Sequence, residues 1–254
     1  MLYIKKEQPT AAIVRSISEI KSRPSWRNAV EPSAIRDHFD EIDKNAVRES
    51  LLSEQHGLCA YCMKRITNSG LVTTIEHWRP LSKSKDSALD YNNFLAVCKG
   101  GTDISLQPNE RRVLCCDAHK GNDTDLSISP FDEFMMEHIT YDSQGVIKFS
   151  PKQDYTAIQA ASISHDLNDT LQLNGIMSND GKMGADTSTC LRKGRKDAYK
   201  SAKAKIDYLR KRGKLSVATM DNEITKLLEA QDRPEYAGVA LFLYRAERKR
   251  LSYK

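Results

Sequence analysis

The spacing of apolar residues predicts helices in the first 50 positions. Apolar residues between Ala11 and Ile20 recur at helical spacing, and Arg23-Pro24-Ser25 ends that stripe. Further helices are predicted from Pro32 onward and from about Lys44 to Glu54. We therefore expect residues 1–50 to form a helical N-terminal region.

The pattern changes after residue 50. The stretch from Val72 to His77 is rich in β-branched residues and predicts a strand, while Tyr91 to Val97 predicts the start of a helix. The polar stretch from Lys99 to Leu114 contains Gly, Pro and Asn, and it predicts a long exposed loop. We expect residues 51–140 to form one unit.

Residues 141–254 predict a hairpin followed by helices. The hairpin strands are expected at Glu137 to Tyr141 and at Val146 to Phe149, and Ser178 to Ser188 is expected to be a loop. Helices are expected over Ile158 to Leu173 and Arg192 to Lys214, with a last helix over Val217 to Ala230. An apolar segment from Tyr236 to Tyr244 and a basic tail from Arg245 to Lys254 follow it. The predicted fold class is therefore α+β and mostly helical.

Composition narrows the protein class. The chain has 254 residues, of which 39% are hydrophobic and 29% charged, and its formal net charge is +5. These values are typical of a soluble globular protein. No run of 18 apolar residues occurs, so we expect no transmembrane helix, and the start of the chain lacks an apolar leader. We expect a cytoplasmic protein whose six cysteines bind metal rather than form disulfides.

One segment is strongly basic. The range from Arg192 to Lys214 carries eleven Lys and Arg residues against Asp197 and Asp207, a net charge of +9. Such a run is often just a solvated helix face. Alternatively, it contacts phosphates or an acidic partner.

The cysteines are spaced as zinc ligands. Cys59 and Cys62 form a Cys-x-x-Cys turn, Cys98 follows, and either Cys115 or Cys116 completes four thiolates for one tetrahedral ion. The turn alone is also compatible with a redox pair. Cys190 is isolated and is expected to behave as a small hydrophobic residue.

Between these cysteines lie residues suited to phosphodiester hydrolysis. That reaction needs a base and a cation, and histidine suits the base because its ordinary pKa lies near neutrality. Glu76, His77 and Asn93 supply a carboxylate, an imidazole and an amide. Neighbours in a strand point to opposite faces, so Glu76 and His77 can approach one spot only where the strand ends, as Pro80 suggests.

This ordered set resembles the zinc-braced HNH (ββα-metal) nucleases. The motifs are Cys59-Ala60-Tyr61-Cys62, Ile75-Glu76-His77-Trp78-Arg79-Pro80, Asn93 to Cys98 and Cys115 to Asn122. The resemblance implies that His77 is the general base, that Glu76 is a ligand of a catalytic Mg²⁺, with Mn²⁺ as the alternative ion, and that Asn93 is either a further metal ligand or the group that orients His77. It also implies Cys116 as the fourth zinc ligand, since Cys116 lies four residues before Lys120.

The last motif position has two candidates. Asp117 follows Cys116 directly, where many HNH sequences have a histidine, and His119 lies two residues later. We prefer His119 by residue type as catalytic residue and metal ligand, and Asp117 stays open. Arg79 and Lys120 are expected to contact the nucleic-acid phosphates.

The motifs are most similar to those of the PtuB family, the HNH subunit of Septu anti-phage systems and of some retron effectors. This resemblance implies an ABC/SMC-like ATPase partner, PtuA, and in retrons a reverse transcriptase with its RNA–DNA product. The expected function is an HNH endonuclease in bacterial anti-phage defence, with DNA as the favoured substrate. Structured RNA such as tRNA is an alternative substrate, and a non-catalytic zinc scaffold is an alternative function.

Overall fold

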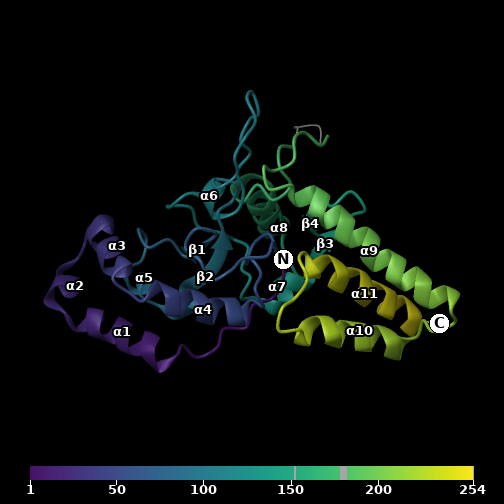
Figure 1. Cartoon of the computed structure of the whole chain (residues 1–254), viewed down its shortest axis with the longest axis horizontal. Helices are drawn as coiled ribbons and strands as arrows, with labels where there is room; N and C mark the ends of the chain where they lie inside the picture. Colours follow the sequence, from purple (N-terminus) through teal and green to yellow (C-terminus); the bar gives the residue numbers. More distant parts are fainter. Residues whose placement is uncertain (152, 178–181, 254) are drawn as a thin grey trace.

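The computed structural model describes residues 1–151, 153–177 and 182–253. Helices dominate, and two small antiparallel strand pairs make the fold α+β, as predicted. Figure 1 shows the N-terminal helices gathered at one end of the molecule and the last three helices at the other. The first strand pair lies between these two groups.

The N-terminal region contains α1 (Ala11–Ser22), α2 (Pro24–Asn28), α3 (Pro32–Asp40) and α4 (Lys44–Glu54). Local capping explains their starts: the Asp43 side chain accepts hydrogen bonds from two backbone N–H groups of α4. Pro24 ends α1 as expected but also begins α2, because proline is well suited to the first helical turn.

The central strands are β1 (Thr73–His77) and β2 (Phe94–Cys98), which pair antiparallel with Thr73 opposite Cys98 and His77 opposite Phe94. The helix that we expected from Tyr91 to Val97 is wrong. The structure has one 3₁₀ turn, η1 (Tyr91–Asn93), and then strand β2. A short, fully apolar run is compatible with either a buried strand or a buried helix, and here pairing with β1 decides between them.

The elements around this pair are α5 (Lys85–Ala88) and the one-turn helix α6 (Asp117–Lys120). Between β2 and α6, residues 99–114 form the expected loop, which projects from the molecule as a long arm in Figure 1. Gly100 allows the two ends of this loop to meet. The φ angle of Gly100 is +59°, and a Cβ atom added there would lie 2.1 Å from the Cys115 carbonyl oxygen. The Cys115 N–H donates to the Gly100 carbonyl at 3.0 Å.

The C-terminal part begins with α7 (Glu133–Glu137) and the hairpin of β3 (Ile139–Tyr141) and β4 (Ile147–Phe149), which confirms the predicted hairpin. Part of the loop predicted over 178–188 lies outside the described residues, namely 178–181. Three predicted helices are confirmed with small shifts, and a fourth helix, α11 (Ala237–Ser252), continues from the apolar segment through most of the basic tail. The three confirmed helices are α8 (Ala157–His165) with the π-helical turn η2 (Asp166–Thr170), α9 (Leu191–Lys211) and α10 (Val217–Glu229).

Two hydrophobic cores hold these elements. The main core joins the N-terminal helices, both strand pairs and α8. A smaller core joins α9, α10 and α11 through Ala202, Ile206, Leu209, Met220 and Tyr244. Within the parts of the chain that the structure describes, none of the helices combines the length and apolarity needed to cross a membrane.

Candidate metal centre and the adjoining carboxylate and histidine groups

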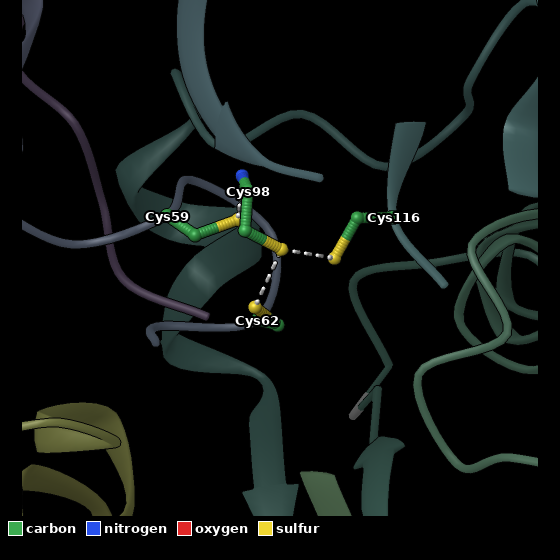
Figure 2. A group of neighbouring side chains, drawn as sticks. All are labelled: Cys59, Cys62, Cys98 and Cys116. Atoms are coloured by element: carbon green, nitrogen blue, oxygen red, sulfur yellow. Dashed lines mark hydrogen bonds between the residues drawn. The ribbon is translucent and has the colours of Figure 1, made fainter. Parts of the chain in front are cut away.

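Four cysteines converge between β2 and α6, as Figure 2 shows. The Sγ atoms of Cys59, Cys62, Cys98 and Cys116 all lie within 4.8 Å of one another. Cys98 is half-buried and the other three are buried. These are the four ligands predicted from the sequence.

The sulfur separations fit a zinc ion. The Cys98 Sγ lies 3.7 Å from the Cys62 Sγ and 3.8 Å from the Cys116 Sγ. A tetrahedron with Zn–S bonds of about 2.3 Å has S···S edges of about 3.8 Å. Disulfides are excluded, because an S–S bond is about 2.05 Å long. The cluster could therefore hold a metal ion such as zinc.

Three local structures place the sulfurs. Cys59 and Cys62 lie in a tight turn in which the Met63 N–H donates to the Cys59 carbonyl at 3.0 Å. Cys98 ends β2, and its N–H donates to the Cys59 Sγ at 3.3 Å. Cys116 precedes α6 with φ at +56°, an unusual value for a residue other than glycine, and its N–H is held by the Leu171 carbonyl at 2.8 Å.

The two other cysteines stand outside this group. Cys115 is buried beside the cluster, and its Sγ lies 3.5 Å from the Thr189 hydroxyl. Cys190 is exposed. The choice of Cys116 over Cys115, left open by spacing alone, therefore agrees with the geometry.

Glu76 faces the short helix α6. Its Oε1 accepts from Tyr61 Oη at 3.3 Å and forms a buried ion pair with Lys120 Nζ. Burial raises the pKa of Glu76 to about 8; the charge of Asp117 adds to the rise, and Lys120 opposes it. Two carboxyl groups and one ammonium group therefore meet on the α6 side of β1.

His77 faces the opposite side of the same strand. Its ring lies 4.4 Å from Phe39 of α3 and 5.1 Å from Phe94, and only 6% of the residue is exposed. Its Nε2 donates to the Ala88 carbonyl at 3.0 Å, which leaves Nδ1 as the proton acceptor in the neutral ring. Burial lowers the pKa of His77 to about 4, helped by the charges of Arg36, Lys120 and Lys44.

Asn93 holds the chain that leaves β1. Its Oδ1 accepts from the Arg79 N–H at 2.8 Å, and its Nδ2 donates to the carbonyls of Arg79 and Ser87 at 2.9 and 3.0 Å. The amide is thus engaged on both sides and is 7% exposed. The Asn93 side chain is therefore not placed beside Glu76 as a metal ligand. Its hydrogen bonds instead fix the backbone of Arg79.

The two expected phosphate contacts differ in exposure. Arg79 is exposed and lines a cavity of about 350 Å³ with Trp78, Lys83 and Asp125. Lys120 is buried, donates to the His77 carbonyl at 3.2 Å, and pairs with Glu76. The expectation that Lys120 contacts phosphate is therefore corrected, because its buried ammonium group pairs with Glu76 instead.

The structure also separates the two candidates for the last motif position. Asp117 interacts with Glu76 through its charge and a side-chain hydrogen bond. His119 is exposed, and its Nδ1 lies 3.1 Å from the Thr170 carbonyl. Asp117 rather than the preferred His119 is brought to Glu76, because alternate positions on a one-turn helix point in different directions.

The sequence did not predict three neighbours of these groups: Tyr61, which contacts Glu76, and Arg36 and Lys44, whose charges act on His77. Tyr61 lies inside the Cys-x-x-Cys turn, so its contact with Glu76 follows from the turn reaching β1. Arg36 and Lys44 come from the N-terminal helices, which carry no nuclease motif, and no signal in the sequence placed them near His77. The Lys44 Nζ lies 4.3 Å from the centre of the Phe39 ring, and that ring in turn contacts His77.

No family model matches the chain, and no curated protein matches it. Among the described residues, the four cysteines are the only group in which three or more Cys, His, Asp or Glu ligand atoms gather closely.

Proposed function

We propose that this chain is a zinc-braced HNH endonuclease. One observation carries the proposal: an antiparallel strand pair and a short helix meet on a four-cysteine centre, Glu76 and His77 end strand β1, and Asp117 at the start of α6 interacts with Glu76. A zinc scaffold alone does not require an acidic residue and a histidine at that place.

The groups on the α6 side of β1 would bind the catalytic metal ion. Glu76 and Asp117 would hold the Mg²⁺, which commonly takes only one or two protein carboxylates and completes its shell with water and substrate phosphate. The bound ion would neutralise charge that develops on the phosphate and leaving oxygen. Lys120 keeps the Glu76 carboxylate in place beside α6.

By the resemblance, His77 would accept the proton of the attacking water, and Nδ1 is the ring nitrogen left to take it. Because the ring is buried on the α3 side of β1, this role requires the side chain to reach the α6 side when substrate binds. In the structure described, the bond from Nε2 to the Ala88 carbonyl fixes the tautomer of the ring. A pKa of about 4 makes the free imidazole a weak base. The negative charge of a bound phosphodiester would raise that pKa again, because an opposite charge nearby favours the protonated ring.

The substrate and partner rest on the resemblance in the motifs Cys59 to Cys62 and Ile75 to Pro80. They favour DNA, with structured RNA as the alternative, and an ABC/SMC-like ATPase that controls the nuclease in anti-phage defence. Arg79, positioned by Asn93, is the arginine best placed to bind the phosphate beside the cleaved bond.

A cleavage assay tests the proposal. The full chain is incubated with Mg²⁺ and labelled DNA or RNA, and His77→Ala is compared with the wild type. Loss of a general base is expected to slow cleavage by about 10²–10⁴-fold while zinc content stays the same. Equal cleavage by His77→Ala would refute the role of His77, and absence of cleavage with every substrate would refute the nuclease.

A non-catalytic zinc scaffold remains the second candidate. It is favoured by the burial of His77, the complete use of the Asn93 amide and the ion pair of Lys120 with Glu76. These contacts are what a structural role needs. If the scaffold is correct, His77→Ala changes stability but leaves every nucleic-acid substrate intact, as does the wild type.

A further inference from the structure

Helix α9 carries a line of lysines along its exposed face. Lys193, Lys196, Lys200, Lys203 and Lys211 fall within a sector of about 80° at 3.6 residues per turn. We call these five residues the lysine stripe. Four of them are exposed, and Lys196 is half-buried.

The basic segment is less uniform than its sequence suggests. Arg192 and Arg195 point inward and are buried. The Arg195 guanidinium donates to the carbonyls of Gly145 and Leu173 at 2.6 and 2.9 Å, so it joins α9 to the β3–β4 hairpin. These two arginines are structural, and the charges left for a partner are on the opposite, outward face.

Most of the stripe is not neutralised by the protein. Among the described residues, the side chains of Lys193, Lys203 and Lys211 have no acidic partner. Lys196 donates to the Gln144 amide oxygen at 2.9 Å. The Lys200 Nζ lies 4.0 Å from the Asp197 Oδ1, which is a long distance for an ion pair. An exposed pair at such a distance contributes little, so the stripe keeps its positive charge.

We infer that the lysine stripe binds the phosphate backbone of a nucleic acid away from the catalytic groups. From Lys193 to Lys211 the stripe is about 27 Å long at 1.5 Å per residue, which equals the axial rise of about eight base pairs of a duplex. Sequence-independent contacts of this kind position a nucleic acid without reading its bases. The inference deepens the proposed function, because it extends the substrate contact beyond the cleaved bond.

The composition of the stripe favours nucleic acid over an acidic protein. Stable protein interfaces are depleted in lysine and have an apolar or aromatic centre. Beside the five lysines, α9 exposes Asp197, Ser201 and Ala204, together with the aromatic residue Tyr208, whose ring is covered in part by the Arg212 guanidinium. A single exposed aromatic side chain of this kind is smaller than the apolar centre of a stable protein interface. The large apolar side chains Ile206 and Leu209 are buried on the other side, against α10 and α11.

The test is binding of the full chain to a fluorescent 24-base-pair DNA duplex and to a single strand of the same length, in a salt series without added Mg²⁺. The variant reverses four charges together: Lys193→Glu, Lys200→Glu, Lys203→Glu and Lys211→Glu. A matched control makes the same change in charge elsewhere: Lys5→Glu, Arg15→Glu, Lys21→Glu and Lys226→Glu, all at exposed positions. Circular dichroism and zinc content establish that both variants fold.

The stripe variant is expected to reduce the slope of log affinity against log salt by about 3 to 4 for the duplex and by about 3 for the single strand. The control should change it by less than about 1. Equal loss in both variants, or wild-type binding by the stripe variant, would overturn the inference. The binding test contains no Mg²⁺ and does not measure cleavage, so its result is independent of the proposed function. If the stripe binds nucleic acid but the separate Mg²⁺ assay shows no cleavage, only the nuclease proposal is refuted.

Discussion

The cysteine centre and the region around Glu76 and His77 share one strand pair but are organised differently. Four sulfurs converge in the cysteine centre, with separations of 3.7 and 3.8 Å that suit one ion. Glu76 and His77 are neighbours in sequence, yet they face α6 and α3 on opposite sides of β1. Ligands carried by turns and strand ends can meet at a point, whereas neighbours inside a strand are separated by its pleat.

The two regions also differ in how many metal ligands the protein itself supplies. The cysteine centre is a complete ligand set that ties the turn at Cys59, the end of β2 and the start of α6 together. In the proposed catalytic site, the carboxyl pair of Glu76 and Asp117 would supply only part of the ligand set of a Mg²⁺ ion, and water and a substrate phosphate would complete it. The first region should therefore govern folding and the second should govern activity.

The largest expected effect is loss of the cysteine centre. Cys62→Ser should lose zinc and unfold, because structural zinc contributes apparent binding energies of about 10–16 kcal/mol in small zinc-binding domains. Cys190→Ser is the control, since Cys190 is exposed and apart from the cluster. Metal analysis and thermal unfolding measure both. A folded Cys62→Ser protein without zinc would show that the centre is dispensable.

Removal of Lys120 should come next. Lys120→Met leaves Glu76 buried beside Asp117 without its counter-charge, and breaking a buried pair on one side typically costs about 3–5 kcal/mol. The double variant Glu76→Gln with Lys120→Met should recover part of that loss, as measured by urea unfolding. If Lys120→Met unfolds like the wild type but binds nucleic acid more weakly, Lys120 is a phosphate contact after all.

Gly100→Ala should destabilise the link between the two ends of the projecting loop. The positive φ alone costs about 1–2 kcal/mol, and the collision with the Cys115 carbonyl adds about 1–3 kcal/mol. Gly213→Ala is the control, because Gly213 also has positive φ but has no atom within 4 Å of an added Cβ. Equal unfolding midpoints for the two variants would mean that the loop adapts without strain.

The smallest expected effect is a pH dependence of stability due to His77. Its folded pKa of about 4 lies below the ordinary 6.5, so the unfolded chain binds the proton first as the pH falls. Stability is therefore lost between pH 6.5 and 4, by about 2 kcal/mol between pH 7 and 5. His77→Gln should lack this part of the loss in urea titrations at the two pH values. An identical pH dependence in both proteins would show that His77 is not buried as described.

Helices with caps and clear periodicity were predictable. The limits expected for α4 and α10 match within a residue, since apolar spacing and N-caps are local signals. The zinc ligands were predictable for a similar reason: a Cys-x-x-Cys turn fixes two sulfurs by itself. The fourth ligand needed the HNH resemblance, and the geometry agrees with it.

Features that depend on tertiary contacts were not predictable. Strand β2 was mistaken for a helix because a five-residue apolar run carries no period. The inward direction of Lys120 depends on a buried carboxylate 44 residues away. Likewise, the packing of Phe39 against His77 depends on how α3 meets the strand pair. Spacing along the chain contains none of this information.

In the proposed nuclease, the carboxyl groups on the α6 side of β1 form the catalytic metal site. The most direct measurement compares Mg²⁺-dependent cleavage by Asp117→Ala and His119→Ala with that of the wild type. Asp117→Ala should lose activity and need more Mg²⁺, because Asp117 interacts with Glu76, while His119→Ala should cleave within a few-fold of the wild type. Full activity in Asp117→Ala together with its loss in His119→Ala would contradict the account.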